Sequence, residues 1–124
     1  MNLQALVDSI PAPSTADMAE RRQFARRYTL VFLRKGPALP ENDEAHNEQL
    51  QVEHLQHLTK LQLLGKLILN GPILEGHDIL GVSVYAAELE EARTLAEMDP
   101  KVRAGYLSVE ALPWIAVPSA TSSS

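Results

Sequence analysis

The sequence contains no cysteine and no apolar run as long as a membrane helix needs. Without cysteine the chain has no disulfide, no thiolate nucleophile and no thiolate metal ligand. A bilayer-spanning helix takes about 20 consecutive apolar residues, and no segment approaches that length. The first eight residues lack the basic start and apolar core of a secretory signal. We therefore expect a cytoplasmic protein that does not contact a membrane.

Positive charge is also scarce. The chain has 11 lysines and arginines against 16 aspartates and glutamates, which gives a net charge of −5. Binding to a phosphate backbone needs a basic surface, so we expect no nucleic-acid partner. The six glycines are scattered and form no phosphate-binding loop. We expect no nucleotide and no other cofactor.

The remaining composition is that of an ordinary folded domain. A chain of 124 residues with 45% hydrophobic and 22% charged residues is large enough for one core. Its organisation predicts an N-terminal helical extension over residues 1–27, a folded domain over 28–118 and a disordered polar tail over 119–124.

The order of elements within the folded domain is β-α-β-β-α-β. Strands are predicted over residues 28–35, 66–73, 79–86 and 107–117, with helices over 42–64 and 89–98. This order is typical of the α+β ferredoxin-like fold, an antiparallel sheet with two helices on one face. The apolar segments at 67–69 and 79–82 indicate that both sheet faces are apolar. We expect a homodimer joined through the open sheet face, because a large apolar surface is rarely left in water.

The most informative residue is His54, which lies on an apolar helix stripe. At 100° per residue, Leu50, Leu58 and Leu61 all fall within about 40° of it, so the imidazole should point inward. Such a ring either completes a buried hydrogen bond or transfers protons near neutral pH. Both predicted helices cover the same sheet face, so Asp99 at the end of the second helix is able to approach His54. A neighbouring carboxylate would fix its tautomer and raise its basicity. The alternative is that Asp99 only caps the chain before Pro100.

Other residues are candidates for lining a small-molecule site. His57 flanks the His54 stripe, and the Gly71-Pro72 corner is predicted to form a wall near His54. Tyr28 and Trp114 lie at strand ends, where they are able to line a pocket or belong to the core. A metal site built from the two helical histidines and a third would need an acidic neighbour that this face lacks, so we predict no metal.

The ordered motifs from His54 to Gly71-Pro72, followed by Glu90-Glu91-Ala92, Asp99-Pro100, Gly105 and Pro113-Trp114, resemble the YCII-related (YciI-like) domain family. The resemblance covers about residues 28–117. It implies a dimeric α+β barrel and an active-site His and Asp at positions matching His54 and Asp99. It also implies a relation to muconolactone isomerases and to a dehydrochlorinase acting on hydroxylated chloroaromatics.

Two functions of different classes follow. The first is a small cofactor-independent enzyme of the lyase, isomerase or dehalogenase type, acting on a small cyclic, aromatic or lactone-like compound. His54 would be its general acid and base, and Asp99 would orient the ring. The second is a non-catalytic dimeric domain that binds a small ligand or a partner protein.

Overall fold

The computed structural model describes residues 2–39 and 42–119. The chain divides into two compact units, which we treat separately. The smaller unit lies within residues 1–26 and 116–124, and the larger unit spans residues 27–115. The predicted site belongs to the larger unit.

Two short helices make up the N-terminal segment of the smaller unit. Helix α1 spans Leu3–Asp8 and begins at Asn2, whose side chain accepts hydrogen bonds from the first turn. Helix α2 spans Thr15–Arg22 and begins with a capping box, in which Ser14 and Asp17 satisfy each other's backbone N–H groups. Local capping therefore accounts for where each of these helices starts.

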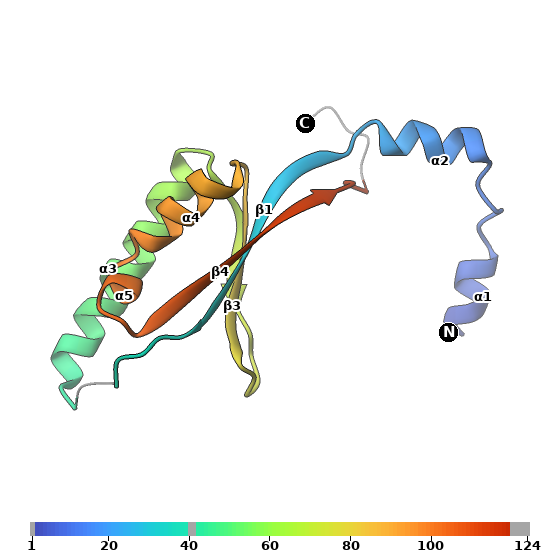
Figure 1. Ribbon diagram of the computed structural model, residues 1–124. Helices are drawn as coiled ribbons and strands as arrows, with labels where there is room; N and C mark the ends of the chain where they lie inside the picture. The colour runs from blue at the N-terminus through green and yellow to red at the C-terminus, as the bar shows by residue number, and fades with distance from the viewer. Residues whose placement is uncertain (1, 40–41, 120–124) are drawn as a thin grey trace. The chain divides into compact units, whose positions relative to one another are not determined.

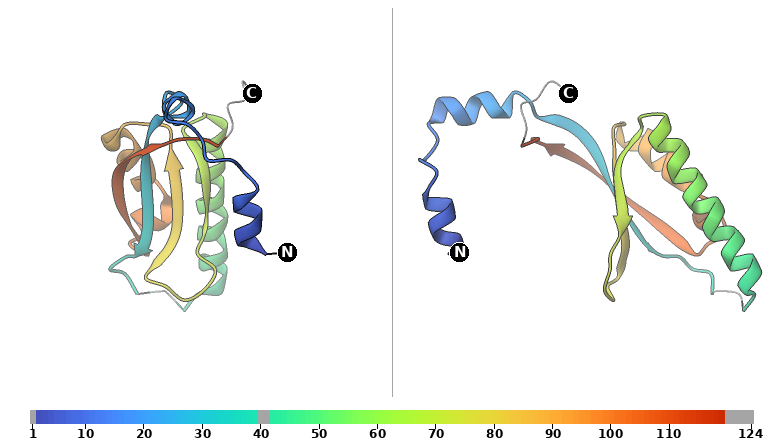
Figure 2. Two further views of the ribbon diagram at one scale, coloured as in Figure 1. Left: turned by 90° about the vertical axis from the view of Figure 1, so that its right-hand side faces the viewer. Right: turned by 180° about the vertical axis from the view of Figure 1, so that it is seen from behind.

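The larger unit has the ferredoxin-like arrangement that the sequence predicted (Figure 1). Its elements, in chain order, are β1 (Arg26–Lys35), α3 (Glu44–Leu63), β2 (Leu67–Pro72), β3 (Ile79–Tyr85), α4 (Leu89–Glu97), α5 (Pro100–Arg103) and β4 (Leu107–Ala116). The strand order in the sheet is β2-β3-β1-β4. Helices α3, α4 and α5 lie on one face of this sheet (Figures 1 and 2). Strand β4 is an edge strand, which is where Pro113, lacking a backbone donor, is tolerated.

Helix α3 begins and ends where its sequence signals lie. Asp43 caps its start by accepting a hydrogen bond from the backbone N–H of His46. Gly65 follows its last turn with a positive φ of 75°, and the N–H of Lys66 reaches back 3.0 Å to the carbonyl of Leu61. This is the Schellman ending, in which glycine adopts the left-handed conformation without a steric penalty.

The core lies between this helical layer and the sheet. The pairing of β1 with β3 places Thr29 opposite Tyr85 and Val31 opposite Ser83, and all four residues are buried. Because side chains alternate along a strand, these four share the helix-facing side of the sheet.

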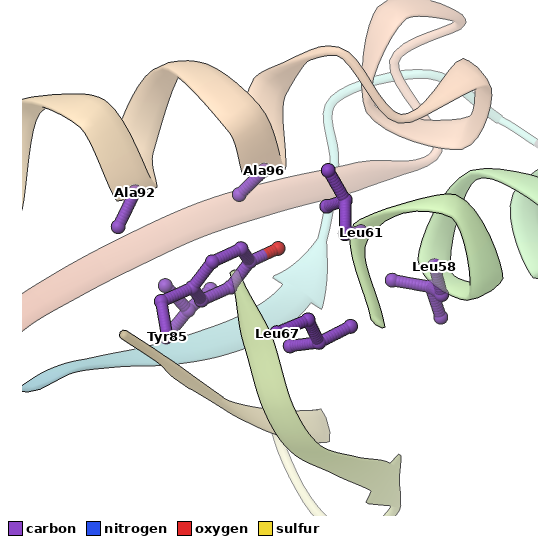
Figure 3. Packing of buried hydrophobic residues seen from close by; sticks show 7 residues of the cluster. Leu58, Leu61, Leu67, Tyr85, Ala92 and Ala96 are labelled. Carbon is purple, nitrogen blue, oxygen red and sulfur yellow. The ribbon is translucent and has the colours of Figure 1, made fainter. Parts of the chain in front are cut away.

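Helices α3 and α4 cover the core on the side opposite the sheet. Its buried apolar residues are Val31, Leu58, Leu61, Leu67, Tyr85, Ala92 and Ala96. The predicted inward stripe is confirmed, since Leu50, Leu58 and Leu61 are the buried residues of α3. The small side chains of Ala92 and Ala96 face the Tyr85 ring (Figure 3) and let α4 approach the sheet closely. Among the residues described, no helix is both long and apolar enough to cross a bilayer.

Candidate active site

His54 and Asp99 come together between α3 and the start of α5. The imidazole Nδ1 lies 2.5 Å from Oδ2 of Asp99. The His54 side chain is 12% exposed and the Asp99 side chain 3% exposed. A charge-assisted contact of this length between nearly buried groups is among the stronger hydrogen bonds in proteins.

The local sequence explains why the Asp99 carboxylate is held in place. Pro100 opens helix α5, and Asp99 is its N-cap residue. Oδ1 of Asp99 accepts a hydrogen bond of 2.9 Å from the backbone N–H of Lys101. Helix α5 in turn packs against α3 and α4. The two carboxylate oxygens therefore have separate partners, the cap and His54, and the side chain cannot rotate without losing one of them.

This contact fixes the orientation and tautomer of the His54 ring. An ionised carboxylate only accepts hydrogen bonds, so the neutral imidazole carries its proton on Nδ1. Nε2 then holds a lone pair and has no protein partner among the described residues. Every described side-chain N or O atom that is sealed from solvent has a partner. Nε2 is therefore not sealed, and His54 lines a cavity.

That cavity has a volume of about 350 Å³ and lies between α3 and the β2–β3 part of the sheet. Its size is within the range of about 300–1,000 Å³ that is usual for small-molecule sites. Apolar walls and a few polar groups line it. The polar lining residues are Gln51, His54, Asn70, Ser83 and Lys101. Apolar walls with a few polar groups are typical of small-molecule sites, and the His54 side chain beside them is only 12% exposed.

Tyr85 lies in the core behind this pair. Burial, and after it the negative charge of Asp99, raise the pKa of the Tyr85 phenol from 10.0 to about 12. Tyr85 extends from β3 toward the helical layer (Figure 3). It is thus a neutral phenol at physiological pH.

The structure brings four of the predicted site residues together and separates the other three. Gly71 and Pro72 line the same cavity as His54, and Asp99 holds the His54 ring from behind. His57 turns instead toward α4, where its Nε2 lies 2.8 Å from the carbonyl oxygen of Leu95.

Tyr28 and Trp114 contact each other, with ring centroids 6.4 Å apart and planes inclined at 48°. Neither is among the described residues that line the His54 cavity. Their roles as ligand contacts, like those of the other site residues, stay predictions.

Several lining residues were not predicted from the sequence, among them Gln51 and Lys101. Gln51 lies one helical turn before His54, so the helical repeat is a signal that places it on the same face. Lys101 follows Asp99 by two residues, and its ammonium donates a hydrogen bond to Oε1 of Gln51. No sequence pattern indicates that these two side chains meet, because the contact depends on how α5 packs against α3.

Within residues 2–39 and 42–119, no three or more histidine, aspartate or glutamate side chains are grouped as metal ligands. His57, the second helical histidine, is already bonded to a backbone carbonyl.

Fold and site together define an α+β domain of ferredoxin-like topology in which a buried His–Asp pair opens onto a cavity. The chain belongs to the YCII-related domain family, whose model matches residues 28–115. Among solved structures, it is similar to a protein of unknown function from Rhodopseudomonas palustris, with 19% identity and a TM-score of 0.35. The match covers 86% of this chain and 95% of that chain. No curated protein matches the chain.

Proposed function

We propose that this protein is a cofactor-independent enzyme that transfers a proton on a small cyclic, aromatic or lactone-like compound. The reaction would be of the lyase, isomerase or dehalogenase type. One observation carries the proposal: Asp99 holds Nδ1 of His54 while the opposite ring nitrogen is free of protein partners beside a cavity. A structural histidine needs no such opening.

The proposed reaction needs only one base. The lone pair of Nε2 takes a proton from a carbon atom of the bound compound, and the Asp99 carboxylate stabilises the imidazolium that forms. The electron pair left on the substrate shifts along a conjugated system or expels a leaving group such as chloride. In an isomerisation, the same imidazolium returns its proton to a different carbon.

The test uses a substrate with an ordinary acidic C–H group. We would incubate the full-length protein with α-angelica lactone, a β,γ-unsaturated lactone, in D₂O and follow C–H exchange and double-bond migration by proton NMR. His54→Gln should slow both by at least about 10²-fold, the lower end of general acid–base contributions. His77→Gln is the matched control, because His77 lies in the exposed β2–β3 turn, where its Nδ1 accepts from the N–H of Ile79.

Either of two results would contradict the enzyme proposal. One is exchange at the same rate in His54→Gln and the parent. The other is absence of exchange across a panel of lactones and chlorinated hydroxyaromatic compounds. The second result would favour the alternative, a non-catalytic domain that binds a small ligand or a partner protein.

We also propose that two copies associate through the sheet face that the helices leave open. The pairs Leu30–Val84 and Phe32–Val82 lie on that face, because they alternate with the buried pairs of β1 and β3. On β4, Trp114 is 43% exposed. Contiguous apolar surface of this kind usually marks an interface.

Analytical ultracentrifugation tests the association. Phe32→Asp should convert a dimeric parent into a monomer, whereas Leu64→Asp, at an exposed position after α3, should leave the dimer intact. A monomeric parent at micromolar concentration would refute the proposal.

A further inference from the structure

A second cavity adjoins the one that contains His54. It has a volume of about 370 Å³ and lies between the loop after β1 and the first half of α3. Leu80, Lys101 and Leu107 line both cavities. The two spaces therefore adjoin along these three residues.

The wall of the second cavity is mostly apolar. Its lining includes Leu39, Leu50, Leu80, Tyr106 and Leu107. No aspartate or glutamate is among the described residues that line either cavity. This space suits the hydrocarbon part of a ligand rather than a polar one.

Lys101 supplies a positive charge where the cavities meet. Its ammonium contacts the neutral carboxamide of Gln51, and none of the ion pairs found among the described residues involves it. Lys35 adds a second positive charge to the lining of the second cavity. The chain as a whole carries a net charge of −5, so the positive charge of the cavity lining is opposite in sign to that of the whole chain. Apolar walls strengthen its attraction for an anion.

From this arrangement we infer that the site takes an amphiphilic anion. Lys101 binds its carboxylate at the junction, the second cavity holds its apolar arm, and the part that reacts lies beside Nε2 of His54. The position of the reacting part rests on the proposed function. The binding of the carboxylate and the apolar arm does not depend on the proposed function, because it is inferred only from the charges and the apolar lining of the cavities.

Binding of fatty acids to the full-length protein tests the inference without any turnover. We would measure the affinity of octanoate by calorimetry and compare it with octanamide, which has the same chain and no charge. Octanoate should bind at least about tenfold more tightly than octanamide. Affinity should rise by up to about fourfold for each added CH₂ between butanoate and octanoate, as burial of a methylene predicts.

Variants of Lys101 identify the group that binds the carboxylate. Lys101→Met should weaken octanoate binding at least about tenfold, and Lys101→Arg should restore most of it. Lys60→Met is the matched control, since Lys60 is an exposed lysine of α3 that lines neither cavity. The α5 cap uses the backbone N–H of Lys101 and not its side chain, so these variants keep that contact.

The outcomes separate this inference from the proposed function. Three results would each overturn the inference, whatever the exchange assay shows. They are equal octanoate affinity in Lys101→Met and the parent, equal affinity of the parent for octanoate and octanamide, and no octanoate binding at millimolar concentration. Lys101-dependent binding without proton exchange on any lactone or chlorinated hydroxyaromatic compound of the panel would leave the inference standing and refute the enzyme proposal. His54→Gln should retain octanoate binding, and its loss there alone would place the anion on the imidazole and overturn the assignment to Lys101.

Discussion

Two substitutions of Asp99 differ in which contacts of its side chain they remove. Asp99→Ala loses the cap on Lys101, which is usually worth about 1 kcal/mol, and the contact with His54. A hydrogen bond to a charged group contributes roughly 1.5–3 kcal/mol. We therefore expect Asp99→Ala to lower the free energy of unfolding by about 2.5–4 kcal/mol. Asp99→Asn keeps an oxygen for the cap and should cost about 1 kcal/mol less.

The Asp99→Asn variant should also lose activity beyond its loss of stability. With its amide oxygen on the cap, the amide NH₂ group faces Nδ1 of His54 and donates to it. The proton of the neutral ring then moves to Nε2, which can no longer act as a base. We expect C–H exchange to fall by at least about 10²-fold in a variant that remains folded.

A double-mutant cycle measures the His54–Asp99 contact itself. Urea unfolding followed by circular dichroism, at one fixed protein concentration, would give the stabilities of His54→Ala, Asp99→Ala, the double variant and the parent. The coupling energy should be about 1.5–3 kcal/mol. Additivity within about 0.5 kcal/mol would refute the reasoning, because it would mean that the 2.5 Å contact does not stabilise the fold.

Three further perturbations test the fold around the site. The folded-state pKa of Tyr85 is raised to about 12. The neutral phenol therefore contributes roughly 2–3 kcal/mol of stability below pH 10, and this contribution is lost between pH 10 and 12. Tyr85→Phe should flatten the curve of unfolding free energy against pH in that window, and an unchanged slope would contradict this. Gly36→Ala would place a Cβ atom 2.1 Å from the carbonyl oxygen of Gly105 and should lower the free energy of unfolding by more than about 3 kcal/mol. Gly71→Ala is the control: its Cβ meets nothing within 4 Å, so thermal unfolding should show a loss of less than about 1 kcal/mol. Gly65→Ala meets no atom but keeps a φ of +75°, so it should cost about 1–2 kcal/mol; a cost near zero in the same measurement would argue against the Schellman ending.

Short helices were the hardest elements to predict. No helix was predicted between residues 98 and 107, but the structure forms α5 over Pro100–Arg103, whose start is stabilised by the Asp99 cap. The extension predicted as helical over residues 1–27 contains two separate short helices, α1 (Leu3–Asp8) and α2 (Thr15–Arg22). Helices of one or two turns carry too few residues for a periodic pattern, so packing and single caps decide them.

What the sequence determined by itself was local or periodic. The cap at Asp43 and the glycine at Gly65 set the ends of α3, and the 3.6-residue repeat set which of its faces is buried, with His54 beside it. These signals act within a few residues of chain, so no tertiary information is needed to read them. The order of strands and helices then restricted the topology to the ferredoxin-like arrangement.

Only the tertiary structure decided what faces the imidazole. The contact of His54 with Asp99 crosses 45 residues of chain, and that of Gln51 with Lys101 crosses 50. Both depend on the angle at which α5 packs against α3, and no repeat in the sequence encodes that angle. The two cavities that Lys101 lines likewise exist only where several elements of the fold leave space between them. A sequence therefore names the residue that is able to react, while packing determines which charges and walls surround it.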